Sequence, residues 1–229
     1  MYFAAGRSSS PAARADIETT DLIAAVDQGF GWFGASFEIE KWGDSGSLES
    51  FGYRGSLYLD LERFNIGVEA EQRDIDLTFT ITGPRDRVIS RTTDLKSDGL
   101  GLFFGVDLTD WWRIYGSARE YDYSRNLNLL PRLDVLNFLS SSTLTLANSF
   151  LEDDRRIGFE WSVGRSFINL SFGRNHSAVD HTELNSVNAS VLFPISYRMD
   201  LELNLGRSKF QSFEPSAYGG VMLLIYGGG

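Results

Sequence analysis

Apolar residues alternate with polar or small residues in short segments along most of this chain. Within residues 50–62, for example, Phe51 and Leu57 fall on one face, whereas Arg54 and Asp60 fall on the other. Successive side chains of a β-strand point to opposite faces, so a period of two predicts strands rather than helices. About ten strands are expected by this criterion, over residues 29–41, 50–62, 66–82, 87–108, 111–124, 152–164, 166–177, 184–194, 198–210 and 216–226.

The connections between these expected strands differ in length in a regular way. Those after even-numbered strands are short, at residues 63–65, 109–110, 165 and 195–197, and those after odd-numbered strands are longer, at residues 42–49, 83–86, 125–151, 177–183 and 211–215. Short turns at one end and long loops at the other are expected of barrels that cross an outer membrane. An even strand count places both chain termini at the short-turn end.

Aromatic residues collect at that same end, namely Phe64, Trp111, Trp112, Phe167, Phe193, Tyr197 and Tyr226. Amphipathic rings prefer the boundary between membrane and water, so this row predicts an interfacial girdle. Together these features make residues 29–226 resemble the bacterial outer-membrane β-barrels. The resemblance implies an all-β, closed, antiparallel transmembrane barrel with periplasmic turns and termini and extracellular loops. In that class the last strand commonly ends in an aromatic residue, which would be Tyr226, although the glycines 227–229 follow it here.

Composition narrows the possible classes further. The chain has 229 residues, a net charge of −10 and no cysteine, which excludes disulfides, thiolate ligands and a cysteine nucleophile. A surplus of negative charge repels phosphate backbones and argues against nucleic-acid binding. The longest apolar run, near residues 221–226, is far shorter than the roughly 20 residues that a spanning helix requires.

Residues 1–28 precede the first expected strand and are predicted to form an N-terminal tail. Ala12, Ala13 and Ala15 resemble the end of a secretory leader, but no apolar core precedes them. A leader remnant and a periplasmic segment both stay open. Residues 21–28 suit either a short periplasmic helix or a segment inside the barrel.

Two segments are expected to extend beyond the membrane. Residues 72–97 continue the third and fourth expected strands past the outer leaflet, and a change of phase near Gln72–Asp74 predicts a bulge. Residues 125–151 form the longest loop, and the spacing of apolar residues around Pro131 predicts a short amphipathic helix there. That helix could plug the barrel mouth, rest on the membrane or bind a partner.

If the apolar rows face lipid, the opposite rows line the lumen and carry its charges. The expected lumenal acids are Glu38, Glu40, Asp60, Glu69, Glu71, Glu160, Asp200 and Glu202, and the expected lumenal bases are Arg54, Arg113, Arg119 and Arg156. Most acids and most bases lie on different groups of strands, so we expect acidic and basic walls on opposite sides. Two interpretations stay open: a salt-bridged core that fills a narrow barrel, and a transverse field across a water-filled constriction.

Glycines accompany the basic residues on the neighbouring expected strand. Gly99, Gly101 and Gly105 point inward beside Arg113 and Arg119, and their missing side chains leave room for long ones to lie across the lumen. About ten strands enclose a small interior, so any pore should be narrow.

The two histidines, His176 and His181, are the candidates for catalysis, near one outer loop. Omptin-type barrel proteases carry an Asp-x-His pair on one strand face, whereas Asp180 and His181 are adjacent and would point in opposite directions. Barrel-embedded lipid A deacylases use a His and a Ser on one face, and the adjacent His176 and Ser177 fail in the same way. No catalytic residue, metal site or cofactor is therefore predicted.

The sequence favours an integral outer-membrane barrel that acts as a narrow solute channel or as the barrel of an envelope or secretion assembly. One alternative is a surface-binding barrel that uses residues 72–97 and 125–151; another is a barrel-embedded hydrolase. The last alternative is a soluble lipocalin-like barrel, in which the apolar rows face the interior. Expected partners are outer-membrane lipid and lipopolysaccharide, with an envelope protein as a further candidate.

Overall fold

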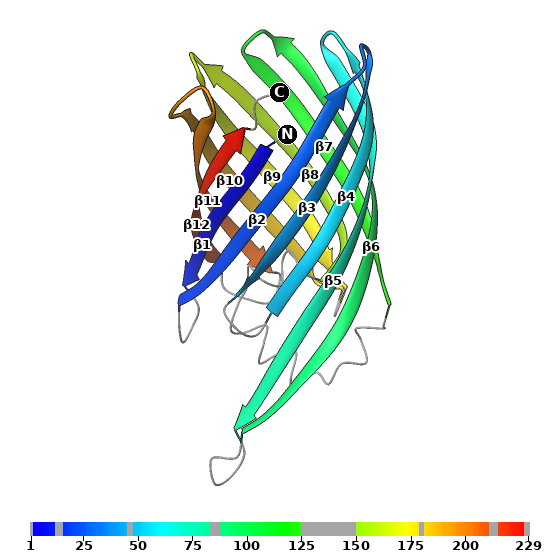
Figure 1. Ribbon diagram of the computed structural model, residues 1–229, viewed down its shortest axis with the longest axis vertical. Helices are drawn as coiled ribbons and strands as arrows, with labels where there is room; N and C mark the ends of the chain where they lie inside the picture. The colour runs from blue at the N-terminus through cyan, green and yellow to red at the C-terminus, as the bar shows by residue number, and fades with distance from the viewer. Residues whose placement is uncertain are drawn as a thin grey trace.

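The chain forms one closed, antiparallel barrel of twelve strands, in which the first strand pairs with the last (Figure 1). The computed structural model describes residues 2–11, 16–44, 48–82, 88–124, 150–178, 181–210 and 215–226. The strands are β1 (Tyr2–Pro11), β2 (Asp16–Gly29), β3 (Phe33–Asp44), β4 (Leu48–Leu61), β5 (Phe64–Thr82), β6 (Val88–Thr109), β7 (Trp112–Tyr123), β8 (Leu151–Val163), β9 (Ser166–Ser177), β10 (Glu183–Pro194), β11 (Met199–Phe210) and β12 (Ser216–Tyr226). The predicted fold class is confirmed, with two strands more than the expected ten.

The two additional strands are β1 and β2, in the segment that was expected to be a tail. Both take part in the closed sheet, because β1 pairs with β12 on one side and with β2 on the other. Alternation of apolar and polar residues did not predict β2, because the middle of this strand is apolar on both faces. Leu22 and Val26 face outward, whereas Ile23 and Ala25 face inward, so no alternation is visible there.

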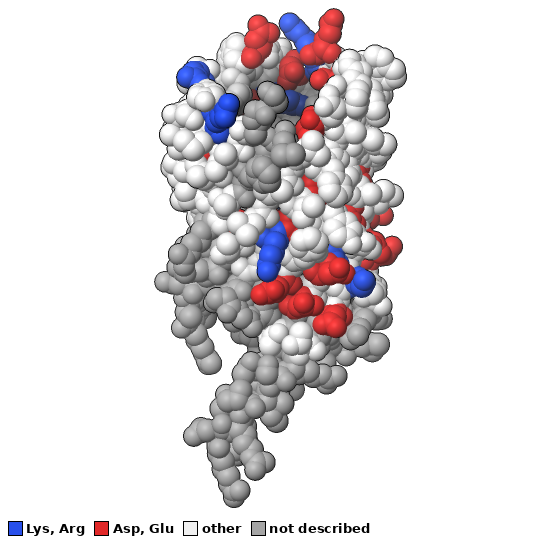
Figure 2. Space-filling view, viewed as in Figure 1, with Lys and Arg blue, Asp and Glu red and all other residues white. Residues whose placement is uncertain are grey.

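The apolar rows of the barrel face outward, as expected. Phe104, Trp161 and Leu203 are 39%, 42% and 42% exposed on the outer surface. On the face shown in Figure 2, charged side chains mostly gather toward the two ends of the barrel. An uncharged, apolar band around a closed sheet is what a lipid bilayer requires, because it leaves no backbone edge in hydrocarbon. The alternative of a lipocalin-like barrel, with its apolar rows facing the interior, is therefore wrong.

The β5–β6 hairpin projects past the other strands at the long-loop end (Figure 1). The bulge expected near Gln72–Asp74 is absent, because the pairing of β5 with both neighbours runs through these residues without a register shift. Instead, the polarity of the two faces exchanges: Asp74 and Asp76 face outward, and Ile75 faces inward and is 1% exposed. The strand has left the apolar band at this height, so its outer face meets water. Bulges occur elsewhere, between Asp107 and Thr109 and between Leu151 and Asp153.

Both chain ends lie at the end of the barrel that carries the short turns (Figure 1). Exposed rings gather there, including Trp111 and Tyr197 from the expected girdle and also Phe30 and Trp32 from the β2–β3 turn. Tyr226 departs from the expected girdle, because its hydroxyl donates a hydrogen bond at 2.8 Å to Asp200 on the lumenal face. The helix expected after Pro131 and the terminal glycines 227–229 fall outside the described residues. Within the described part of the chain, no helix has the length and apolar character needed to cross a membrane.

Candidate functional site

The inward side chains of β3, β4 and β5 form a dense ionic network. Arg54 on β4 lies at its centre, with Nη1 at 3.2 Å from Glu38 Oε1 and Nε donating to Glu71 Oε2 at 3.0 Å. Arg54 Nε also lies 4.0 Å from a carboxylate oxygen of Glu69. The Glu69 and Glu71 side chains are almost fully buried, at 7% and 4% exposed. Buried carboxylates are tolerated only when cations and hydrogen bonds compensate their lost hydration, as this arginine does.

The network extends across β6 to β7 and β8 through Arg119. Its guanidinium forms an ion pair with Glu69, with Nη2 donating to Oε2 at 3.2 Å, and its Nη1 lies 4.0 Å from Asp154 Oδ2. Gly101 of β6 lies between them, and a Cβ there would come within 2.6 Å of Arg119 Cγ. This confirms that the inward glycines of this strand make room for long side chains.

Arg73 is a member of this network that the sequence analysis missed. Its Nη2 lies 3.3 Å from Glu40 Oε2, and its guanidinium also contacts Glu71. The assumed bulge had broken the alternation two residues after Glu71. Glu69 and Glu71 face inward, so uninterrupted alternation predicts that the residue two positions further along, Arg73, faces inward as well.

Acidic and basic walls on opposite sides, as the sequence analysis expected, are not what the structure shows. Carboxylates and guanidiniums interleave on neighbouring strands from β3 to β8, and Arg119 meets Glu69 only two strands away. The expectation failed because a long guanidinium reaches across an intervening strand at a glycine, so that Arg119 contacts Glu69 over Gly101. The ionic network fills this side of the lumen.

The remaining expected lumenal charges lie toward the short-turn end. Arg113 Nε is 3.7 Å from Asp107 Oδ1, and Arg113 stands opposite Glu160 in the β7–β8 pairing. Asp60 is exposed at the rim, and Asp200 accepts the hydrogen bond from Tyr226 described above.

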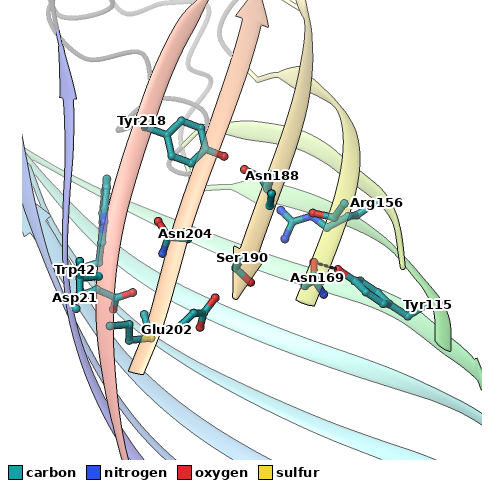
Figure 3. Close-up of a pocket in the computed structure, with 15 residues that line it drawn as sticks. Asp21, Trp42, Tyr115, Arg156, Asn169, Asn188, Ser190, Glu202, Asn204 and Tyr218 are labelled. Carbon is teal, nitrogen blue, oxygen red and sulfur yellow. Dashed lines mark hydrogen bonds between the residues drawn. The ribbon is translucent and has the colours of Figure 1, made fainter. Parts of the chain in front are cut away.

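The opposite side of the lumen is open and holds a cavity of about 390 Å³. We call this cavity the polar lane. Its walls include Asp21, Trp42, Tyr115, Arg156, Asn169, Asn188, Ser190, Glu202, Asn204 and Tyr218 (Figure 3). Because β9 to β11 present mostly short amides and hydroxyls inward, they leave space that the arginines fill on the other side. The cavity along this wall therefore follows from side-chain size.

Two tyrosines fix the shape of the polar lane. Tyr115 stands opposite Gly158 and its hydroxyl donates to Asn169 Oδ1 at 2.9 Å, which holds the ring flat against the wall. Tyr218 stands opposite Gly206 in the same way. In both pairs a Cβ on the glycine would collide with the tyrosine ring. The glycines therefore let the two rings lie along the wall instead of across the lane.

Three charged groups remain in the polar lane. Arg156 projects from β8 on one side, and Asp21 and Glu202 lie on the other (Figure 3). Arg156 Nη2 is 3.7 Å from Asp154, the last carboxylate of the ionic network. In the polar lane, charges of opposite sign therefore face each other across a cavity, as the transverse arrangement expected from the sequence would have them.

Apolar side chains form a collar at the long-loop end of the lumen. Ile75 and Leu95 are paired across β5 and β6, and both are 1% exposed. Leu184 on β10 is equally buried, and Phe150 and Leu151 lie at the start of β8 at 4% and 6% exposed. We call these five residues the apolar collar. Apolar side chains at the mouth of a lumen resist the entry of water and ions.

The histidines lie outside the lumen. His176 Nδ1 is 3.0 Å from both carboxylate oxygens of Asp153 on the neighbouring strand, and His181 Nδ1 is 2.6 Å from Glu152 Oε2. Neither lines the polar lane. Asp180 falls outside the described residues, and among those that are described no group of three His, Cys, Asp or Glu side chains is placed to hold a metal ion.

Several solved structures that share this fold are described as porins, channels or autotransporter translocator domains. The KdgM porin, in complex with disordered oligogalacturonate, matches with a TM-score of 0.61 at 8% identity over 100% of both chains. The translocator domain of the autotransporter NalP from Neisseria meningitidis matches with a TM-score of 0.60 at 9% identity, over 99% of this chain and 86% of that one. The CymD monoaromatic hydrocarbon channel matches with a TM-score of 0.58 at 7% identity, over 100% of this chain and 88% of that one.

No protein-family model matches the chain, and no curated protein sequence matches it. The structural matches and the apolar outer surface nevertheless give the chain the fold of the bacterial outer-membrane β-barrels. Within that class the chain is a twelve-stranded, porin-like barrel. At such low identity the likeness extends to the fold alone.

Proposed function

We propose that this barrel is a narrow channel that lets small polar solutes cross the outer membrane along the polar lane. The observation that carries the proposal is the unequal filling of the lumen. The ionic network from β3 to β8 occupies one side with paired, buried charges, and the other side keeps a cavity of about 390 Å³ lined mainly by amides and hydroxyls. Paired charges hold the barrel rigid, and unpaired neutral polar groups suit a passing solute.

Charge should give this channel a preference for cations over anions. Among the inward side chains of the described strands, acidic residues outnumber arginines, and Asp21 and Glu202 stand in the lane itself. Acidic linings attract cations and repel anions at short range, because the narrow lumen excludes most screening salt. We expect the reversal potential in a salt gradient to show cation selectivity.

In the proposed orientation the short turns and both termini face the periplasm, and the projecting β5–β6 hairpin lies outside the cell. The girdle of exposed rings at the short-turn end supports this orientation. Beyond the apolar band at the other end, outward-facing charges include Asp74 and Lys96 at 3.4 Å, and Arg174 and Glu183 at 2.6 Å. Charges just beyond the apolar band would meet the phosphates and bridging cations of lipopolysaccharide. We propose lipopolysaccharide as the partner of these outward-facing charged residues.

Conductance of the purified chain in planar bilayers tests the channel. Ser190 faces the polar lane from β10, and Ser190→Trp should block most of the current by filling it. Val187 lies on the lipid face of the same strand, 43% exposed, so Val187→Trp is the matched control and should leave the current unchanged. A folded wild-type barrel without discrete openings would contradict the proposal.

A second candidate function is binding of an envelope partner through the β5–β6 hairpin. The observation that favours it is length: β5 pairs with β6 up to Thr82, whereas its pairing with β4 ends at Leu77. The end of the hairpin is thus a two-stranded ribbon whose outer edges have no partner among the described strands, and such edges can accept an added strand. Deletion of residues 79–91 should abolish partner capture and leave conductance unchanged if this is the function.

A further inference from the structure

Two buried polar atoms in the polar lane have no hydrogen-bond partner. One is Arg156 Nε on β8, and the other is Asp21 Oδ1 on β2. They belong to side chains of opposite charge on opposite sides of the same cavity (Figure 3). A buried donor or acceptor left without a partner costs about 1–3 kcal/mol, so two in one cavity point to a ligand that bonds to both.

Arg156 differs from the other buried arginines in how it is paired. Arg54 and Arg119 each contact two or more carboxylates, with hydrogen bonds at 3.0 and 3.2 Å, and are 24% and 19% exposed. Arg156 has one ionic contact, to Asp154 at 3.7 Å, and its side chain is 39% exposed. Its guanidinium therefore keeps donors available for a carboxylate, which the planar fork of arginine binds in a bidentate way.

The carboxylates on the other side of the polar lane are also available to a ligand. In the described part of the chain, neither Asp21 nor Glu202 forms an ion pair with a basic side chain. Both carboxylates lie in the lining of the lane. A lining carboxylate that forms no ion pair with a basic side chain favours an ammonium group, which can donate hydrogen bonds to it.

We propose, on the basis of the channel function above, that the polar lane binds extended zwitterions such as short peptides. The solute's carboxylate lies against Arg156, its ammonium lies against Asp21 and Glu202, and its middle hydrogen-bonds to Asn188 and Asn204. A singly charged solute satisfies one wall and leaves the other without a counter-ion. A cavity of about 390 Å³ holds roughly a dozen waters, more than a single small amino acid fills, so charges separated by a chain match it better.

Triglycine and the capped analogue N-acetyl-diglycine amide form a matched pair of probes, since they are similar in size and differ in terminal charges. Current block of the full-length barrel in planar bilayers measures the binding of each. We expect triglycine to block at about tenfold lower concentration than the capped analogue, the factor that one charge-assisted contact provides. In Arg156→Gln and in Asp21→Asn the ratio of the two blocking concentrations should fall toward one.

Arg155 supplies the matched control, because it precedes Arg156 on β8 but faces outward and is 65% exposed. Arg155→Gln removes the same charge and should keep the full preference for triglycine. Equal block by both probes in a conducting wild-type barrel overturns this inference and leaves the channel intact, whereas absence of any current overturns the channel itself. If Arg156→Gln does not fold, shown by loss of heat-modifiable migration, Glu202→Gln takes its place and must lower the preference.

Discussion

The carboxylate of Glu69 on β5 and the guanidinium of Arg119 on β7 meet directly over Gly101 of the intervening strand β6. Gly101 pairs with Glu69 on one side and with Arg119 on the other, so the three residues form one row around the barrel wall. The absence of a side chain at the middle position lets an ion pair span two strands. Several consequences of this row and of the lane opposite it can be measured.

Substitution of Gly101 by alanine should destabilise the barrel. The added Cβ would lie 2.6 Å from Arg119 Cγ and 2.9 Å from Glu69 Oε1, so both side chains must move. Overpacking of this kind typically costs about 1–3 kcal/mol. The temperature at which the folded band converts to the unfolded band on a detergent gel reports the change. Gly55→Ala is the control, because a Cβ there meets no atom within 4 Å, and equal effects of the two substitutions would contradict the explanation.

Loss of Arg119 should mainly lower the stability of the barrel, whereas loss of Arg156 should mainly change its ion selectivity. Arg119→Gln leaves the buried Glu69 and Asp154 without a principal cation and should lower the unfolding free energy by roughly 3–5 kcal/mol. Arg156→Gln removes a half-exposed charge from the polar lane and should change ion selectivity, with a much smaller effect on stability. Urea unfolding and reversal potentials, measured on both variants, separate the two roles. A shift of selectivity in Arg119→Gln alone would show that the lane has been placed on the wrong side.

Leu184→Ser should raise the conductance. Leu184 belongs to the apolar collar and is 1% exposed at the long-loop end of the lumen. Apolar constrictions close a pore by excluding water, so a hydroxyl at this position favours a continuous water column. Single-channel recording measures the open probability. Val187→Ser, on the outer face of the same strand, should leave it unchanged.

The projecting hairpin should become more stable as the pH falls. Asp76 and Asp94 stand opposite each other on β5 and β6, and slight burial together with the charge of Asp94 raises the pKa of Asp76 above its ordinary value of 3.8. A raised pKa in the folded state means that the paired hairpin binds the proton more tightly than the open one. Its stabilising contribution is complete below 3.8 and is lost as the pH rises through the raised pKa.

NMR titration of the Asp76 carboxyl group tests this directly. In Asp94→Asn the pKa of Asp76 should move down, because the facing negative charge is gone. An unchanged titration curve in that variant would rule out Asp94 as a cause of the shift.

Which face of each strand lies on the outside of the barrel could be predicted because residues such as Leu57 and Trp161 alternate clearly with polar neighbours. The strand count could not, because the run from Leu22 to Val26 is apolar on both faces and carries no period. Lumenal charges were predicted from parity alone, but their partners depend on how far each guanidinium reaches across the neighbouring strands. Arg73 was missed because a change in the polarity of both faces at Asp74 and Ile75 was interpreted as a change of register.

The partners of β1 along one of its sides lie at the opposite end of the sequence, from Tyr2 against Tyr226 to Ser9 against Gly219. The backbone amides and carbonyls on that side of β1 can therefore pair only after β12, which follows the other eleven strands in the sequence, has been synthesised. Until β12 arrives, the unfinished sheet has two open edges, and hydrocarbon would leave both unsatisfied. Insertion of the wall and its closure into a ring are thus coupled, and a single junction between first and last strands determines when the passage comes into existence.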